Sequence, residues 1–136
     1  MAWIQRLDPI ALAYTMGSDA MVNEPFCVWT TTGAYDITIS SLTPTASTSF
    51  IATGQAIPAN TVNFGVQFDT DTDASDGAVV TEGAVIINQS PAASGSPPSC
   101  LADNAAVYVN FSEAGNLDAA PADTYVDELT MVIEPR

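Results

Sequence analysis

The stretch that most resembles a ligand site is the acidic run over residues 69–77. Asp69, Asp71 and Asp73 alternate with threonine, as carboxylates do at the first, third and fifth positions of a calcium-binding loop. The pattern then departs from that loop, because the sixth position is Ala74 and the twelfth is Val80 rather than glycine and glutamate. We therefore expect at most a weak calcium site over Asp69 to Asp76, and a solvated loop between strands is the better interpretation.

The sequence offers little support for catalysis. It contains no histidine that could act as a base, and no Gly-x-Ser-x-Gly elbow that would present a nucleophilic serine. A carboxylate pair of the glycosidase kind is available in principle among the 16 acids. Most of these acids fall in loops or on solvent-facing positions, however, and no pair stands out. We predict no catalytic residues, no cofactor and no enzymatic activity.

Cys27 and Cys100 are the only two cysteines. Two thiolates with no histidine leave a tetrahedral zinc shell half filled, so a zinc site is nearly excluded. Two isolated cysteines in a turn-rich chain fit one disulfide formed in an oxidising compartment. Two free buried thiols are the alternative.

Five aromatic residues could line a sugar-binding face, because aromatic rings stack on pyranose rings. They are Tyr14, Trp29, Tyr35, Tyr108 and Tyr125. Most of them lie on or beside the apolar positions of predicted strands, so packing in the core explains them better.

The charge balance limits the partners. Sixteen acids face only Arg6 and Arg136, for a formal net charge of −14. Nucleic acid or an anionic lipid surface would need basic residues that the chain lacks. No segment has the roughly 18 uninterrupted apolar residues of a transmembrane helix, so we expect no membrane insertion. We interpret the negative charge as a source of solubility on an exported protein.

The elements that must position these residues are short strands. Apolar residues alternate with polar ones over residues 35–39, 62–68 and 107–111, and shorter apolar runs occur over 26–30, 50–52, 78–80 and 84–87. Glycine or proline interrupts the chain every eight to twelve residues, and no window has helical spacing. This pattern is typical of an all-β sandwich. We predict one domain over residues 1–136 with seven or eight strands.

The last strand has the most informative position. Residues 124–135 alternate, with Tyr125, Leu129, Met131 and Ile133 on one side and Glu128, Thr130 and Glu134 on the other. Period-two patterning of this length predicts a strand half buried against the core. Either this strand completes the fold, or it is half of a structure that another molecule completes.

Several segments together resemble the pilin-type domains of chaperone–usher fimbriae. Their order along the chain is Phe26-Cys27-Val28, residues 33–39, Ile57-Pro58 with residues 62–68, Ser99-Cys100 with residues 104–109, and residues 123–135. The likeness covers residues 26–135. Within this family the chain resembles in particular the archaic and alternative branches, which share features with spore-coat-U-like domains.

This resemblance implies an immunoglobulin-like sandwich that lacks its last strand. Residues 124–135 would lie beside the gap, which a periplasmic chaperone fills first and a neighbouring subunit's N-terminal extension fills permanently. The implied partners are that chaperone, the outer-membrane usher and other pilus subunits, on an exported cell-surface pilus. A disulfide between Cys27 and Cys100 agrees with the oxidising export route.

The N-terminal segment, residues 1–25, allows two interpretations. Ile10, Leu12, Tyr14 and Met16 are either the donor strand of an ordinary mid-fibre subunit or the first strand of the sandwich. In the second case the chain accepts a strand without donating one, as the pilin domain of a tip adhesin does, and we favour it slightly. Residues 1–9 do not resemble a signal peptide, since Asp8 and Pro9 interrupt the hydrophobic region. If the protein is exported, this sequence belongs to a mature or shortened chain.

Two other functions remain open at this level. A self-complete β-sandwich could bind carbohydrate, such as a host or surface glycan, as a lectin or carbohydrate-binding module does. A spore-coat-like or matrix protein would need no partner strand. Counting whether a strand is missing separates these possibilities from the pilin-type domain.

Overall fold

The computed structural model covers the whole chain and describes residues 1–14, 18–41, 49–90, 100–111 and 116–136. In these residues it contains ten strands, one short α-helix and one 3-10 turn. The strands are β1 (Ala2–Gln5), β2 (Met21–Thr30), β3 (Tyr35–Ser41), β4 (Phe50–Gly54), β5 (Thr61–Asp69), β6 (Ala78–Val79), β7 (Val85–Gln89), β8 (Ala105–Asn110), β9 (Tyr125–Val126) and β10 (Leu129–Pro135). The helix α1 is Asn116–Ala119, and the 3-10 turn η1 is Ala74–Asp76.

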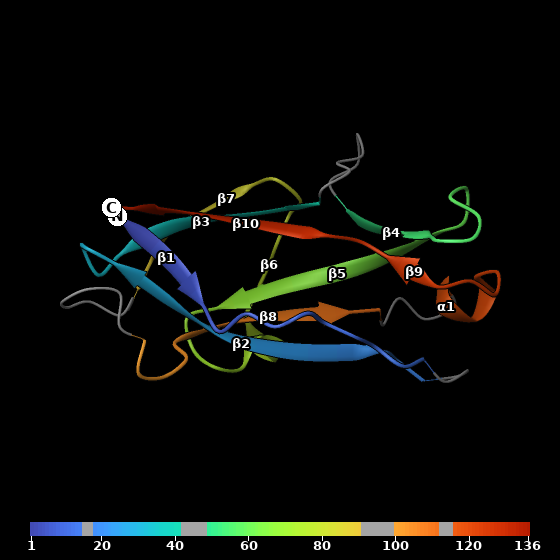
Figure 1. Ribbon diagram of the computed structural model, residues 1–136, viewed down its shortest axis with the longest axis horizontal. Coiled ribbons are helices and arrows are strands. Elements are labelled where there is room, and N and C mark those ends of the chain that lie inside the picture. The colour runs from blue at the N-terminus through green and yellow to red at the C-terminus, as the bar shows by residue number, and fades with distance from the viewer. Residues whose placement is uncertain (15–17, 42–48, 91–99, 112–115) are drawn as a thin grey trace.

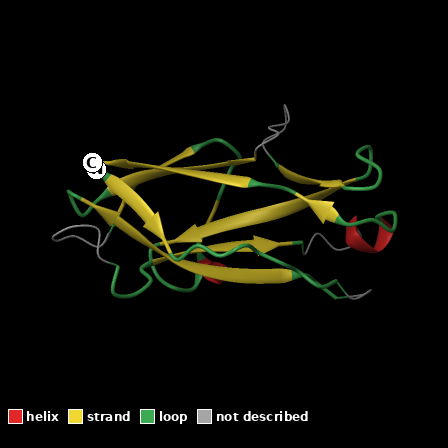
Figure 2. Ribbon diagram, in the orientation of Figure 1, coloured by secondary structure: helices red, strands yellow, loops and turns green. Residues whose placement is uncertain are grey.

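The strands form two antiparallel sheets that face each other as a sandwich (Figures 1 and 2). The larger sheet has the order β1-β2-β8-β5-β4-β9, with β6 added beside β5. The smaller sheet has the order β10-β3-β7. This confirms the predicted all-β sandwich.

Alternation in the sequence becomes alternation of burial in the strands. In β5 the side chains of Val62, Phe64, Val66 and Phe68 are buried, and the residues between them are partly or fully exposed. In β3 every second side chain from Tyr35 to Ser41 is likewise buried, and the side chains between them are partly exposed. Successive side chains of a strand point to opposite faces, so one face of each sheet builds the core and the other meets water.

Aromatic rings link the strands across the core. The ring centroids of Phe26 and Phe68 are 6.4 Å apart, and those of Phe50 and Phe64 are 5.6 Å apart. Phe111 stacks on Phe64 at 5.0 Å. Offset and tilted rings at these separations stabilise a core beyond the area that they bury. They join β2, β4 and β5 into one packed unit.

The two apolar runs on either side of Gly83 do not pair with each other. The runs over residues 78–80 and 84–87 do form separate strands, but they belong to different sheets: β6 pairs with β5, and β7 pairs with β3. The turn between them carries the chain across the sandwich, with Gly83 at a φ of 70°. That left-handed conformation favours glycine, because a side chain at this φ is strained.

The sandwich begins earlier than the sequence predicts. Its first strand is β1, which pairs with the second half of β2 from Gln5↔Cys27 to Ala2↔Thr30. Residues 10–14 form no strand, and Met16 lies outside the described residues. Ile10 and Leu12 still pack against the core as half-buried side chains.

Candidate binding groove

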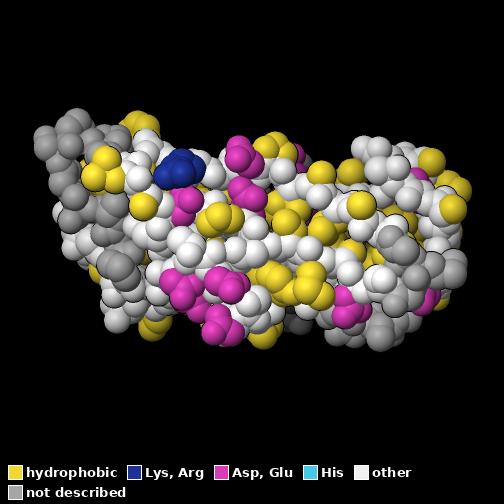
Figure 3. All heavy atoms as spheres, turned by 90° about the horizontal axis from the view of Figure 1, so that it is seen from below, with side chains coloured by type: hydrophobic (Ala, Val, Ile, Leu, Met, Phe, Trp, Pro, Cys, Tyr) yellow, Lys and Arg dark blue, Asp and Glu magenta, His cyan; other side chains and the backbone are white. Residues whose placement is uncertain are grey.

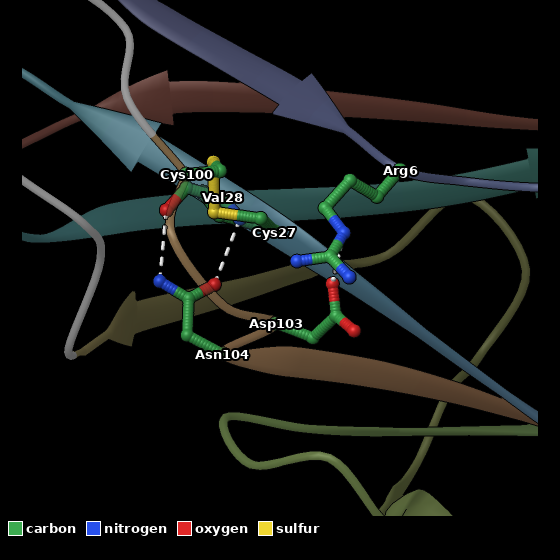
Figure 4. The surroundings of a disulfide bond; sticks show 6 residues. All are labelled: Arg6, Cys27, Val28, Cys100, Asp103 and Asn104. Atoms are coloured by element: carbon green, nitrogen blue, oxygen red, sulfur yellow. Dashed lines mark hydrogen bonds and ion pairs between the residues drawn. A yellow bond between two sulfur atoms is a disulfide. The ribbon is translucent and has the colours of Figure 1, made fainter.

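The two cysteines form the predicted disulfide. Cys27 is fully buried in β2, and Cys100 lies five residues before β8, with 5.9 Å between the two Cα atoms. The chain has no free cysteine. The bond fastens β2 to the segment that leads into β8 (Figure 4).

Two side-chain contacts lie beside the disulfide, and of the residues that make them Asn104 does not stand out in the sequence. Asn104 accepts a hydrogen bond from the Val28 N–H at 2.8 Å and donates one to the Val28 carbonyl at 3.0 Å. Arg6 makes an ion pair with Asp103 at 3.1 Å. Figure 4 shows both contacts next to the sulfur atoms. The amide of Asn104 replaces a backbone partner where β2 and β8 no longer pair.

The C-terminal strand is divided between the two sheets. β9 pairs with β4 in the larger sheet, and β10 pairs with β3 in the smaller one. The chain crosses at Asp127 and Glu128. Oδ1 of Asp127 accepts hydrogen bonds from the Ser41 hydroxyl at 2.7 Å and from the Glu128 N–H at 2.9 Å. These bonds hold the crossing against the end of β3.

β10 is an edge strand. It pairs with β3 in an unbroken register from Leu129↔Ser41 to Pro135↔Tyr35, and no strand of the described residues pairs with its other edge. β1 lies beside its C-terminal part (Figure 1). Edge strands present unpaired backbone N–H and C=O groups, which another strand can bind.

A groove of about 500 Å³ opens along this edge. One wall is formed by residues 7–12, the other by residues from Tyr125 to Met131, and core side chains form the floor. The floor residues are Ala52, Phe64, Val107, Val109 and Phe111. Its lining is therefore largely apolar, and it lies between the two sheets beside an edge strand.

The predicted acceptor residues fall on this groove with one exception. Tyr125, Leu129 and Met131 line it, and all three are half buried. Ile133 has the same parity and also packs against the core, but it is not among the lining residues. The predicted parity of the strand therefore agrees with the structure, while the open part of the groove ends at Met131.

The predicted N-terminal residues are also near the groove. Ile10 and Leu12 line the wall opposite β10. Tyr14 is 39 % exposed and is not among the lining residues. Their segment runs along the groove without a backbone ladder, so the alternation reports which side chains face the core rather than a strand.

The charges near the groove are acidic. Asp8, Asp127 and Glu128 line it, and no arginine or lysine does. Both arginines of the chain are paired elsewhere, Arg6 with Asp103 and Arg136 with Asp36. Figure 3 shows one face of the molecule, on which apolar side chains reach the surface between Asp and Glu side chains.

Asp123 fixes the segment that enters β9. Its carboxylate accepts hydrogen bonds from the N–H groups of Ala56, Ile57 and Thr124 at 3.0, 3.1 and 2.8 Å, and from the Asn60 amide at 3.3 Å. The bond from Ala56 is the largest of the effects that lower the pKa of Asp123. A Cβ at Gly54 would collide with this carboxylate. The turn after β4 is thus tied to the groove wall.

In the acidic run that resembles a calcium loop, the carboxylates accept hydrogen bonds from backbone N–H groups of the same run. Asp69 accepts from the Thr70 N–H, Asp71 from the Asp73 N–H, and Asp73 from the Ser75 N–H. Among the described residues, no group of three acidic, histidine or cysteine side chains is arranged to hold a metal ion. The structure thus shows these three carboxylates in local turn contacts.

The five aromatic candidates do not form one exposed face. Trp29 and Tyr35 are buried, and burial raises the pKa of the Tyr35 hydroxyl. Tyr108 donates to the Met21 sulfur, and Tyr125 donates to the Pro121 carbonyl. Two of the five rings therefore belong to the core and Tyr125 packs against it, which is fewer buried rings than the sequence pattern predicts. No described helix is long and apolar enough to cross a membrane.

Comparison with known proteins shows a likeness in structure only. No family model matches the sequence, and no curated protein matches it. A solved chain from a study describing a "chaperone-tip adhesin complex" in CFA/I fimbriae biogenesis matches with a TM-score of 0.67. The match has 14 % identity and covers 100 % of this chain and 42 % of the other.

A second solved structure is CfaE, the adhesive subunit of CFA/I fimbria of enterotoxigenic Escherichia coli. It matches with a TM-score of 0.51 and 11 % identity, over 90 % of this chain and 43 % of that one. This chain thus spans less than half the length of either protein. The fold therefore resembles part of these two fimbrial adhesin chains. That the chain is a pilin-type domain of the chaperone–usher family, and that it belongs near the spore-coat-U-like branch, stay predictions.

Proposed function

We propose that this chain is a non-enzymatic subunit of a surface pilus that accepts a strand from another protein. The observation that carries the proposal is the apolar groove beside the unpaired edge of β10. A strand inserted there would pair its backbone with β10 and place alternate side chains on the floor. This is β-strand addition, in which backbone hydrogen bonds give affinity and pockets for alternate side chains give specificity.

The partners follow from the same groove. An unfilled apolar groove on a sheet edge promotes aggregation, so the subunit needs a partner until it is assembled. A periplasmic chaperone would fill the groove first, and a neighbouring subunit would replace it at the usher. Export through the periplasm to the cell surface agrees with the disulfide, since disulfides persist in oxidising compartments.

Within the pilus we propose the role of a tip-adhesin module. Residues 7–12 lie along the chain's own groove, with Ile10 and Leu12 packed against its core, and are therefore not free to extend into another subunit. The solved chain from the tip-adhesin complex and CfaE are both more than twice as long as the part that this chain matches. A further, receptor-binding domain would then accompany this one.

The test is to supply the missing strand in the same molecule. A flexible linker after Arg136 would carry a donor strand of alternating valine and threonine back along β10. Burying three valine side chains should stabilise the fold by about 3 to 5 kcal/mol, which corresponds to a rise in Tm of roughly 10 to 18 °C for a domain of this size. The fused protein should also be monomeric in size-exclusion chromatography, while the unfused protein self-associates.

The matched control places aspartate at the three inward positions of the donor. It keeps the linker and the backbone but cannot enter an apolar groove. Equal Tm values for the two fusions, or an unfused chain that is already a stable monomer, would show that the edge of β10 accepts no strand.

A further inference from the structure

We propose that the strand accepted by the groove carries a basic side chain facing Asp127, between apolar residues, and therefore comes from a protein other than a second copy of this chain. This inference rests on the proposed function and names the chemistry of the partner. It is carried by the one polar residue on the inward side of the groove wall.

The groove wall is apolar on its inward side except at one position. Tyr125, Leu129 and Met131 share one parity and line the groove as half-buried side chains. Asp127 has the same parity and also lines it. From Tyr125 to Met131 the wall extends about 20 Å at the usual rise of a strand, so about seven residues of a partner strand fit. One of them must lie opposite Asp127.

Asp127 is only half satisfied by its own chain. Its Oδ1 accepts from the Ser41 hydroxyl and the Glu128 N–H. Its Oδ2 is shielded from solvent and has no hydrogen-bond partner. Buried polar atoms without a partner are uncommon in folded proteins and cost free energy. Because Oδ2 has almost no exposed surface, a positive charge on an inserted strand would stabilise this carboxylate through space rather than by a direct hydrogen bond.

The charge of the site selects a cation over a neutral donor. Asp8 and Glu128 line the same groove, and the Asp8 N–H donates to the carboxylate of Glu24 at 2.9 Å. Arg6 and Arg136 are the only basic residues in the whole sequence, and both already make ion pairs. The partner must therefore supply the positive charge, and complementary charge at an interface gives specificity and faster association.

The chain's own N-terminal segment does not meet this requirement. Residues 10–16 read Ile-Ala-Leu-Ala-Tyr-Thr-Met and contain no charged residue. A second copy donating this segment would bury apolar side chains but leave Asp127 without a cation. The geometry points instead to a different subunit with an alternating apolar strand and one lysine or arginine.

The experiment measures the binding of short peptides to the full chain. Fluorescently labelled peptides of alternating valine and threonine, about nine residues long, carry one lysine at each inward position in turn. A second series carries glutamine at the same positions. A third peptide has the sequence of residues 10–16. At low salt the best lysine peptide should bind about tenfold more tightly than its glutamine partner, and more tightly than the third peptide.

Two matched variants locate the effect. In Asp127→Asn the Ser41 hydroxyl keeps its acceptor, so the fold should persist, but the preference for lysine should be lost. In Glu134→Gln the same charge is removed from the solvent-facing side of β10, outside the groove, and the preference should remain. High salt should reduce the lysine preference, because screening weakens charge pairs at a surface.

The outcomes separate the two proposals. Peptides that bind with no preference for lysine, or a preference that survives in Asp127→Asn, overturn this inference and leave the strand-acceptor function standing. If no peptide of any series binds, both are wrong. A lysine preference that Asp127→Asn removes and Glu134→Gln keeps supports both.

Discussion

Removing the side chain of Asn104 should destabilise the fold more than its position outside the strands suggests. Asn104→Ala leaves both the N–H and the carbonyl of Val28 without the partners that they have at 2.8 and 3.0 Å. Val28 is fully buried in β2. A hydrogen bond of this kind contributes about 1 kcal/mol net, and a buried group left unpaired costs about 1 to 3 kcal/mol.

The expected loss is therefore about 2 to 4 kcal/mol, which is a large part of the 5 to 15 kcal/mol typical of a folded domain. Equilibrium unfolding in urea with the disulfide intact measures it, with tryptophan fluorescence as the signal. Asn104 itself is only partly buried, and water entering the vacated space would give the lower end of the range.

Asn63→Ala is the matched control, because Asn63 is exposed on the solvent side of β5. It should change the free energy of unfolding by less than about 0.5 kcal/mol. Asn104→Asp separates the two hydrogen bonds. It keeps an acceptor for the Val28 N–H but places a carboxylate against the Val28 carbonyl. If Asn104→Ala and Asn63→Ala destabilise equally, the amide of Asn104 does not replace a backbone partner.

Three other predictions concern the disulfide, the Asp123 carboxylate and the groove wall. Replacing Cys27 and Cys100 together by alanine should cost up to about 4 kcal/mol in the chain-entropy model, measured by urea unfolding; an unchanged midpoint would contradict a role in stability. The pKa of Asp123 is lowered in the folded state, so its contribution to stability is present above the unfolded pKa and is lost as the pH falls below about 4. Asp123→Asn should therefore show a shallower loss of stability with acid than the wild type, and equal slopes would refute this. Leu129→Asp places a carboxylate among apolar groove residues and should abolish folding or strand capture at a cost of several kcal/mol. Thr130→Asp, on the exposed side of β10, should be tolerated. Measuring the solubility and the peptide binding of both variants tests this difference.

The sequence predicted which side chains face the core better than it predicted which strands pair. The alternation over residues 62–68 gives the burial of β5 correctly, because one face of that strand meets the core and the other meets water. The parity from Tyr125 to Ile133 is also correct. The break at Asp127 is not visible in the pattern, because parity continues through the crossing while the pairing partner changes from β4 to β3.

The N-terminal segment also shows that alternation predicts which side chains are buried but not which segments pair as strands. Ile10 and Leu12 face the core as their alternation predicts, but the segment forms no ladder and β1 forms earlier, over Ala2–Gln5. Trp3 in β1 is 46 % exposed, so the short strand carries little of the half-buried pattern that identifies a strand. Whether a segment pairs depends on backbone partners that lie far away in sequence, and periodicity contains no information about them.

Three contacts outside the backbone ladders lie where β1, β2 and β8 meet. The disulfide, the Asn104–Val28 pair and the Arg6–Asp103 ion pair all join these segments. β10, in contrast, is held by β3 on one side, and its inward residues Leu129 and Met131 are only half buried. A sandwich with one incomplete edge must obtain its stability from the other strands, because that edge gains its full burial only when a partner strand arrives. Strengthening the contacts among β1, β2 and β8 should therefore raise stability without changing affinity for a donor strand. Filling the groove should raise both the burial of β10 and the order of the crossing at Asp127.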